Sequence, residues 1–200
     1  MVAPAVKAID PEGFEAMFRG DVDPWNYGAS PFEAFKRRAL LRACGDRVRG
    51  RTLELACANG ETTLALAPLS LSLLALDSSP TVIAEAARRT AHLPRVETLQ
   101  AVLPQDMPRG RFDLVVVSEI LYYLAQRDAG LMMARLAEVT RGRIVIVHHL
   151  MDFADAAQKP ARAQHAARHF FGSRMAEVFH ERHGRFEVLA FDAPRRPRPH

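Results

Sequence analysis

The chain has 200 residues, 48% hydrophobic and 25% charged, which suits a single globular domain with a real core and no membrane-spanning segment. Its formal net charge of +4, from 27 basic and 23 acidic residues, falls to about +1 without the three arginines of the terminal APRRPRPH, which argues against a nucleic-acid partner. Two cysteines are too few for a disulfide framework or a zinc site of their own, and the start of the chain lacks the apolar stretch of a signal peptide, so we expect a cytoplasmic protein without a bound metal.

The first 50 residues contain no strand-like run. The stretches FEAMFRG (14–20) and PFEAFKRRALLRACGDRV (31–48) instead place apolar residues near helical spacing. Ser30 and Pro31 favour a start for the second helix, because serine caps helices and proline suits their first turn. We therefore predict an N-terminal helical cap over residues 1–50.

Residues 51–192 alternate between apolar strands and amphipathic helices. Strands that alternate with helices form crossover units and a parallel sheet. Pro68 is expected to end the first helix early, whereas Ser79 and Pro80 open a clearly amphipathic one. The predicted parallel strands are 52–57, 71–76, 95–101, 112–118 and 143–149, and the predicted helices are 61–69, 80–91 and 127–141.

The end of the chain has a different pattern. After a polar, helical stretch around residues 155–173, the strand-like runs MAEVFHER (175–182) and RFEVLAFD (185–192) flank His183 and Gly184. Two such runs around a short polar turn predict a hairpin, so the last two strands are expected to be antiparallel. The predicted fold class is α/β: a Rossmann-like, seven-stranded, mostly parallel sheet with a C-terminal antiparallel hairpin and an N-terminal helical cap. The predicted domains are the cap at 1–50, the core at 51–192 and a disordered Pro/Arg tail at 193–200.

The stretch ELACANGET (54–62) has the form of a ligand loop. A strand that stops at a tight loop before a helix points free backbone N–H groups toward the carboxyl edge of the sheet, where ligands bind. The three positions usually held by glycine are Ala56, Ala58 and Gly60. Because alanine does not readily adopt a positive φ, only Gly60 is expected to keep full backbone freedom, although the loop stays small.

Asp77 ends the second predicted strand, 17 residues after Gly60 (77 − 60). An acid near this spacing is placed to accept hydrogen bonds from the two hydroxyl groups of a ribose. The alternative is that Asp77 caps the following helix, for which Ser78 and Ser79 also offer side chains. The loop, Asp77 and the closing hairpin together favour cofactor binding.

The order of elements and the stretches ELACANG, LLALDSSP and FDLVVVSEILYYL resemble the class I S-adenosylmethionine-dependent methyltransferases over about residues 20–192. The resemblance implies S-adenosylmethionine as cofactor and S-adenosylhomocysteine as product. In that family the loop holds the methionine part of the cofactor, and the acid after the second strand holds the ribose. Carried over to this chain, the expected cofactor-binding residues are Trp25, Lys36, Glu54, Ala56, Cys57, Ala58, Gly60, Asp77, Ser78, Val102, Leu103 and Ser118.

A closer resemblance lies upstream of the loop. DPWNYGASPFEAFKRRALL (23–41) is similar to the amino-terminal cap of the nodulation protein S family, and SEILYYL (118–124) is also typical of it. The type member of that family N-methylates the free amine of a chitin-like oligosaccharide. The resemblance therefore implies N-methylation of an amine of a small molecule or of an amino sugar. The chain departs from the family at Ala56 and Ala58, at Val102, where many relatives carry an acid for the adenine, and in HHLMDFADAAQKP (148–160).

Polar side chains at the ends of the fourth and fifth predicted strands supply the catalytic candidates. Glu119 or His148 is expected to accept or orient the proton of the acceptor, with Tyr122 beside them at the crevice edge. An aromatic pocket suits the dispersed charge of methyl transfer to a neutral amine, so Trp25 and Tyr27 are expected nearby. Structural alternatives stay open: Glu119 as an acid at a helix start, His148 or His149 with satisfied hydrogen bonds, and Trp25 as a packing residue.

Other functions stay open on the residues alone. An O-methyltransferase uses the same cofactor and fold, and a cofactor-binding protein without methyl transfer is compatible with the alanine-bearing loop. A nicotinamide-dependent oxidoreductase is disfavoured by the missing G-x-G-x-x-G and by Glu54 within the first strand. His165 and His169 lack a companion cysteine or an HExxH motif, so no metal site is expected there. The expected partner is a small-molecule or saccharide acceptor, and the expected state is a monomer or homodimer.

Overall fold

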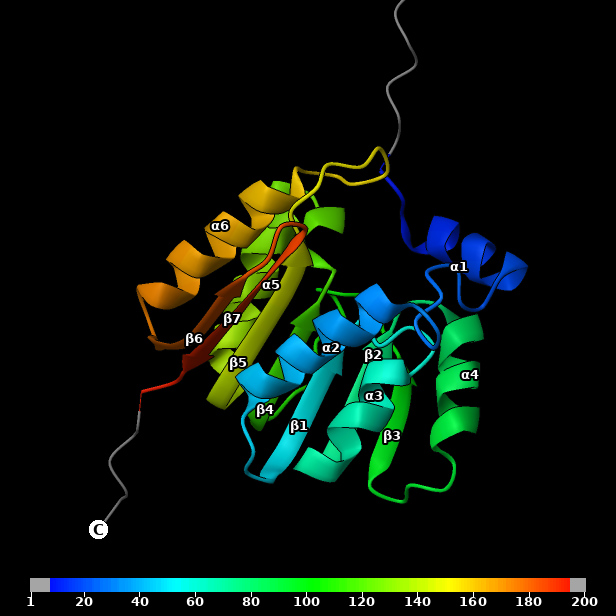
Figure 1. The fold of residues 1–200 in the computed structure, drawn as a ribbon, viewed down its shortest axis with the longest axis horizontal. Coiled ribbons are helices and arrows are strands. Elements are labelled where there is room, and N and C mark those ends of the chain that lie inside the picture. The colour runs from blue at the N-terminus through cyan, green and yellow to red at the C-terminus, as the bar shows by residue number, and fades with distance from the viewer. Residues whose placement is uncertain (1–7, 195–200) are drawn as a thin grey trace, which may run out of the picture.

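The computed structural model describes residues 8–194, in which seven strands form one sheet with helices on both faces (Figure 1). The strand order is β3-β2-β1-β4-β5-β7-β6; β7 is antiparallel to both of its neighbours, and the other pairs are parallel. This arrangement confirms the predicted fold class. The strands are β1 (Arg49–Leu55), β2 (Ser70–Asp77), β3 (Val96–Gln100), β4 (Phe112–Ser118), β5 (Thr140–His149), β6 (Ala176–Arg182) and β7 (Phe186–Asp192).

Three of the helices begin at a capping side chain followed by a proline. The Asp10 carboxylate and the Ser30 and Ser79 hydroxyls each accept a hydrogen bond from the backbone N–H three residues on, at 2.9–3.3 Å. The predicted starts at Ser30 and Ser79 are thus confirmed. The helices of the described range are α1 (Pro11–Gly20), α2 (Pro31–Cys44), α3 (Glu61–Leu66), α4 (Pro80–Thr90), α5 (Gln126–Val139) and α6 (Pro160–Gly172), with short 3-10 helices η1 (Ala67–Leu69) and η2 (Leu121–Tyr123).

Each face of the sheet carries its own hydrophobic core. Helices α2 and α3, which lie in front of the sheet in Figure 1, bury Leu40 and Leu66 against Val145. Helices α5 and α6 cover the opposite face. Because both faces are covered, the central strand β4 is an almost unbroken apolar run, as expected for a buried parallel strand.

The predicted C-terminal hairpin is present. The His183 N–H donates to the Phe186 carbonyl (2.9 Å) in the turn, and β7 lies between β5 and β6 with most of its residues buried. The Ala193 N–H extends the pairing by donating to the Gly142 carbonyl (2.7 Å). Most of the predicted disordered tail, residues 195–200, lies outside the described residues.

Several element boundaries differ from the predictions: α2 ends at Cys44 rather than at 48, and β5 begins at Thr140 rather than at 143, directly after α5. The first strand ends at Leu55 rather than at residue 57, because the backbone turns left-handed at Ala56 (φ 55°). The helix expected around residues 155–173 begins only at Pro160, after an irregular segment over 150–159. Among residues 8–194, no helix combines the length and apolar character needed to span a bilayer.

Candidate active site

A cavity lies where the carboxyl ends of β1, β2 and β4 meet, between the loop after β1 and helix α1. We call it the inner cavity. Most of the residues predicted to hold a cofactor lie in its wall. These are Trp25, Ala56, Ala58, Asp77, Ser78, Val102, Leu103 and Ser118.

The loop after β1 has three residues with left-handed backbone: Ala56 (φ 55°), Ala58 (φ 46°) and Gly60 (φ 83°). The expectation that the alanines would avoid a positive φ was wrong. The loop is tied down by its own hydrogen bonds: the Cys57 N–H donates to the Leu76 carbonyl (2.9 Å) and the Ala58 N–H to Asp77 Oδ2 (3.0 Å). These bonds enforce the glycine-type turn on alanine, at a cost of roughly 1–2 kcal/mol per residue.

Replacing Ala58 by glycine is therefore expected to stabilise the fold by about 0.5–1 kcal/mol, because relief of the left-handed strain exceeds the added entropy of the unfolded chain. The measurement is the free energy of unfolding by urea. A matched control is Ala87→Gly on the exposed side of α4, which is expected to destabilise by about 1 kcal/mol. Equal destabilisation of both variants would contradict the strained loop.

Asp77 joins the loop to the start of α4. Its carboxylate accepts the Ala58 N–H at Oδ2 (3.0 Å) and the Ser79 N–H at Oδ1 (3.1 Å), while Ser79 is the helix cap. A carboxylate offers about four lone-pair positions, so Asp77 keeps acceptor capacity toward the inner cavity, whose wall it lines. Burial raises the pKa of Asp77, with the backbone hydrogen bonds opposing this rise.

Three predicted cofactor residues, Glu54, Cys57 and Gly60, lie beside the inner cavity rather than in its wall. Glu54 is buried beneath the loop, where one carboxyl oxygen has no hydrogen-bond partner and burial raises its pKa to about 8. The Cys57 side chain is buried against Ala86 and Ala75. A Cβ on Gly60 would lie 3.1 Å from Ala86, so this glycine permits close packing of the loop on α4.

Helix α1 closes one side of the inner cavity with Phe14 and Phe18. It is held there by Glu15, whose carboxylate accepts hydrogen bonds from the Ser79 hydroxyl (2.6 Å) and the Thr81 hydroxyl (2.8 Å) at the start of α4. Glu15 was not among the predicted site residues, because a contact across more than 60 residues leaves no local pattern in the sequence. The one local signal at this helix is the spacing of Phe14 and Phe18, which marks its apolar face.

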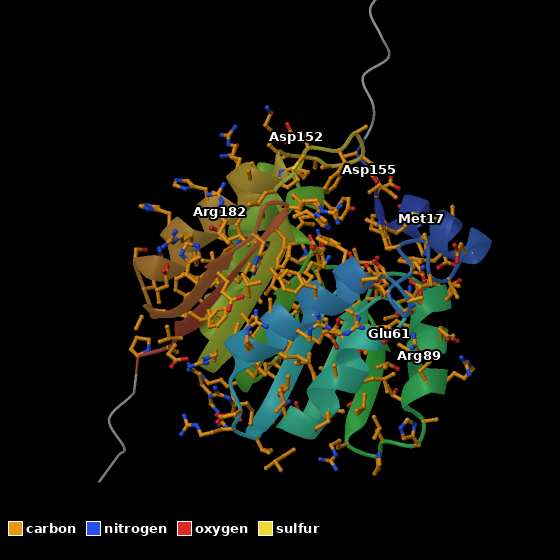
Figure 2. All side chains as sticks on the ribbon, viewed as in Figure 1. Met17, Glu61, Arg89, Asp152, Asp155 and Arg182 are labelled. Atoms are coloured by element: carbon orange, nitrogen blue, oxygen red, sulfur yellow. The ribbon has the colours of Figure 1, made fainter. Side chains whose placement is uncertain are left out.

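The segment after β5, residues 150–159, contacts the start of the N-terminal cap beside the inner cavity. The Ile9 N–H donates to the Asp155 carbonyl (2.9 Å), which brings the start of the cap against this segment. Figure 2 shows Asp155 above α1, which carries Met17, and shows Glu61 and Arg89 paired where α3 and α4 meet. The Arg89 guanidinium also donates to the Asn59 carbonyl (3.3 Å), which fixes the loop after β1 from behind.

A second cavity, which we call the outer cavity, shares Trp25, Tyr27, Glu119 and Tyr123 with the inner one. Its wall combines aromatic rings with charged groups from α2, the end of β4, the end of β5 and the β6–β7 hairpin. The residues found only in the outer wall include Phe32, Glu33, Lys36, Tyr122, His149, Met151, Phe153, Asp155 and Arg185.

Glu119 lies at the boundary of the two cavities, in left-handed backbone (φ 54°). Its carboxylate accepts hydrogen bonds from Lys36 Nζ (2.7 Å), the Tyr122 hydroxyl (2.6 Å) and the backbone N–H of residue 149 (2.8 Å). Burial, the largest influence, would raise the pKa of Glu119, but the Lys36 ammonium together with His149 and His148 outweighs it, so this pKa is lowered to about 2. Glu119 is thus an ionised carboxylate that already holds three donors, which suits orientation of neighbouring groups better than proton uptake.

Lys36, a predicted cofactor residue, lies in the outer wall and not in the inner one. It is 6% exposed and pairs with both Glu119 and Glu33, the latter at 2.9 Å. A lysine on α2 reaches this position because the helix packs across the carboxyl end of β5. The three groups form a buried triad with a net charge of −1.

His148, a predicted catalytic residue, lines neither the inner nor the outer cavity. This residue is fully buried, with its Nδ1 at 2.7 Å from the Gln164 side-chain oxygen and its Nε2 accepting the Leu121 N–H (3.3 Å). Both ring nitrogens are occupied by structural partners, as in the alternative that the sequence left open. The neighbouring His149 instead faces the outer cavity, since successive residues of a strand point to opposite faces.

Tyr122 lies in the outer wall as expected, but its hydroxyl is committed to Glu119 and its ring is 2% exposed. Burial raises the pKa of Tyr122. Within residues 8–194, no group of three or more His, Cys, Asp or Glu side chains is arranged to hold a metal ion.

Comparison with known families matches the model of Nodulation protein S (NodS) over residues 15–144. The chain is 34% identical over 103 residues to the Nodulation protein S of Sinorhizobium fredii, which is 51% of this chain and 48% of that protein. It is 36% identical over 104 residues to the Nodulation protein S of Rhizobium tropici, covering 51% and 43% of the two chains. The chain thus spans about half the length of the curated relatives it matches.

Comparison with solved structures finds the same fold. The crystal structure of N-methyltransferase NodS from Bradyrhizobium japonicum WM9 in complex with S-adenosyl-L-homocysteine superposes with a TM-score of 0.77. The match covers 90% of this chain and 98% of that one at 22% identity. At that identity the similarity establishes the fold.

Proposed function

The chain belongs to the nodulation protein S family, and on that basis we propose that it is an S-adenosylmethionine-dependent methyltransferase that N-methylates an amine of a small molecule or amino sugar. The observation that carries the proposal is Asp77, held against the strained loop with acceptor capacity toward the inner cavity. This is the arrangement expected of a carboxylate that receives two ribose hydroxyls at the switch point of an α/β sheet.

The donor set of the inner cavity fits this cofactor. Asp77 and Ser78 would hold the ribose side, Ala56 and Ala58 would allow close approach of the methionine part, and Val102 and Leu103 would pack on the adenine. The wall lacks an acid at Val102, and the nearby Asp106 carboxylate instead accepts the Val102 N–H (2.9 Å). Recognition of the adenine is thus proposed to rest on packing more than on an acidic partner.

The cofactor supplies an electrophilic methyl group on a sulfonium. The chain supplies alignment and exclusion of water, which are the main requirements of such a transfer. Trp25, Tyr27 and Tyr123 stand in both cavities, so these rings would surround the point where cofactor and acceptor meet. Aromatic faces also stabilise a nearby cation.

The charges of the outer cavity favour an amine as acceptor. Its buried triad of Glu33, Lys36 and Glu119 carries one net negative charge at the boundary with the inner cavity. Such a charge attracts a basic nitrogen and disfavours an acceptor that is itself an anion at that point. A hydroxyl acceptor is the second candidate, because the same orienting groups can hold an O–H.

The test is transfer of labelled methyl from S-adenosylmethionine to a panel of acceptors: glucosamine, a chitooligosaccharide with a free terminal amine, simple primary amines, and the corresponding N-acetylated sugars. Label on the free amines and not on their N-acetyl counterparts supports the proposal. Equal labelling of both sets would indicate an O-methyltransferase. Cofactor binding without label on any acceptor would indicate a binding protein without transfer.

The cytoplasmic location and the monomeric or homodimeric state stay predictions of the same proposal. Cell fractionation checks the first. Size-exclusion chromatography with light scattering checks the second.

A further inference from the structure

We propose that His149 is the group that accepts the proton of the acceptor amine. The proposal rests on the proposed function and assigns a catalytic residue within the same site. It concerns a residue beyond the stretch 15–144 that the family model matches, so the assignment comes from the contacts of this structure.

The His149 ring is held in the outer cavity with its nitrogens uncommitted. Its backbone N–H donates to Glu119 Oε2 (2.8 Å), which fixes where the residue sits. The ring lies 5.3 Å from the Phe32 ring, and its Nε2 is 3.9 Å from Glu119 Oε1, too far for a hydrogen bond. Across residues 8–194, no hydrogen bond to either ring nitrogen is present.

Three of the other titratable groups of the outer wall, Glu33, Glu119 and Tyr122, are occupied, and burial raises the pKa of the phenols Tyr27 and Tyr123, so these stay protonated. Glu119 holds three donors, Glu33 pairs with Lys36, and the Tyr122 hydroxyl donates to Glu119. Asp155 lies at the mouth of the outer cavity, and a carboxylate is an intrinsically weaker base than an imidazole. His149 is therefore the base of the outer cavity with a free lone pair.

The surroundings keep this imidazole neutral. Burial lowers the pKa of His149 below its ordinary value; the Glu119 carboxylate opposes this and the Lys36 ammonium reinforces it. Glu33 from α2 also opposes the lowering, and Arg185 from the hairpin also reinforces it. Near neutral pH the ring can thus take up a proton, and its side chain is 25% exposed, so it can pass that proton to water.

The proposed step balances as follows. The neutral nitrogen of the amine forms a bond to the methyl carbon with its lone pair, while the carbon–sulfur bond breaks and its electrons remain on sulfur as a thioether. The methylated ammonium then gives a proton to a nitrogen of the His149 ring, which releases it to solvent. The same ring can take the proton of an ammonium that enters protonated.

The experiment compares wild type, His149→Ala, His149→Gln and, as a control, His165→Gln on the exposed side of α6. Methyl transfer to glucosamine and to the chitooligosaccharide with a free amine is measured against pH. We expect both His149 variants to lose at least about tenfold in kcat/KM and to lose the inflection of the pH profile that belongs to the His149 ring, so that only the rise caused by deprotonation of the amine itself remains. Added imidazole is expected to restore His149→Ala, and His165→Gln is expected to match wild type.

Two further readouts separate the possible failures. Affinity for S-adenosylhomocysteine within about twofold of wild type shows that the variants are folded. The NMR titration of the His149 ring is expected to give a pKa below its ordinary value, and glucosamine added with S-adenosylhomocysteine is expected to shift it.

A His149 variant with wild-type rate and pH profile, or a ring unaffected by the amine, overturns the inference while the methyltransferase stands. Wild type that binds S-adenosylhomocysteine but methylates no amine overturns the proposed function and the inference with it.

Discussion

Asp77→Ala is expected to weaken binding of S-adenosylhomocysteine by at least about 100-fold. In the proposed role, Asp77 accepts hydrogen bonds from two ribose hydroxyls, each worth about 1.5–3 kcal/mol, and the variant removes both. It also frees the Ala58 N–H, which Asp77 holds in place, so the strained loop loses its tether. Calorimetric titration measures the loss. Because burial raises the pKa of Asp77, wild-type affinity is also expected to fall on acidification before an exposed aspartate would protonate.

The control for this variant is Asp113→Ala. Asp113 is also a strand-end carboxylate that accepts a backbone N–H, that of Arg51 (2.8 Å), but it lies at the amino end of β4, away from both cavities. Its loss is expected to lower stability and to leave affinity for S-adenosylhomocysteine within about twofold. Wild-type affinity in Asp77→Ala, or equal losses in the two variants, would contradict a direct role for Asp77.

Lys36→Met is expected to destabilise the fold by about 3–5 kcal/mol near pH 7, because it leaves the buried carboxylates of Glu33 and Glu119 without their cation. Urea unfolding measures this change. The matched control is Lys159→Met, whose lysine pairs with Asp152 at 3.4 Å on the surface, where such a pair is worth at most about 1 kcal/mol. Similar small losses in both variants would show that the triad does not stabilise the protein.

The pH dependence of this effect has a defined sign. The pKa of Glu119 is lowered from 4.5 to about 2 in the folded protein, so its contribution to stability is full above pH 4.5 and is lost as pH falls toward 2. The pKa of Lys36 is raised from 10.5: burial alone would lower it, but the coulombic attraction of Glu119 and Glu33 outweighs burial. The lysine's contribution is therefore full below pH 10.5 and is lost above it. The difference in unfolding free energy between wild type and Lys36→Met is expected to narrow as pH falls, beginning above pH 4.5, because burial without the lysine raises the pKa of Glu119 in the variant and lets this carboxyl take up a proton earlier.

The fold followed from local signals. Alternating apolar strands and amphipathic helices predicted the parallel sheet, the short turn at His183 and Gly184 predicted the hairpin, and Ser79 with Pro80 predicted the start of α4. Each of these signals is carried by a few neighbouring residues whose physics is local. The positions of Asp77 and Ser118 at one edge follow directly from the parallel order of their strands.

The details of the site could not be predicted from the sequence, because they depend on contacts between residues that are far apart along the chain. His148 and His149 are equivalent in sequence, and only packing of α6 through Gln164 decides which ring is buried. Lys36 was placed with the cofactor by resemblance, whereas the structure pairs it with Glu119, 83 residues away. The left-handed backbone of the alanines depends in the same way on hydrogen bonds that N–H groups of the loop donate to Asp77 and Leu76. The composition of the loop does not reveal these bonds.

The central claim is that the inner cavity is built for S-adenosylmethionine and its product. The most direct test is calorimetric titration of the unmodified chain with S-adenosylhomocysteine, beside NAD and NADP. We expect a single site with micromolar affinity for S-adenosylhomocysteine and no heat of binding from either dinucleotide. Binding of NAD or NADP instead, or no binding of S-adenosylhomocysteine, would contradict it.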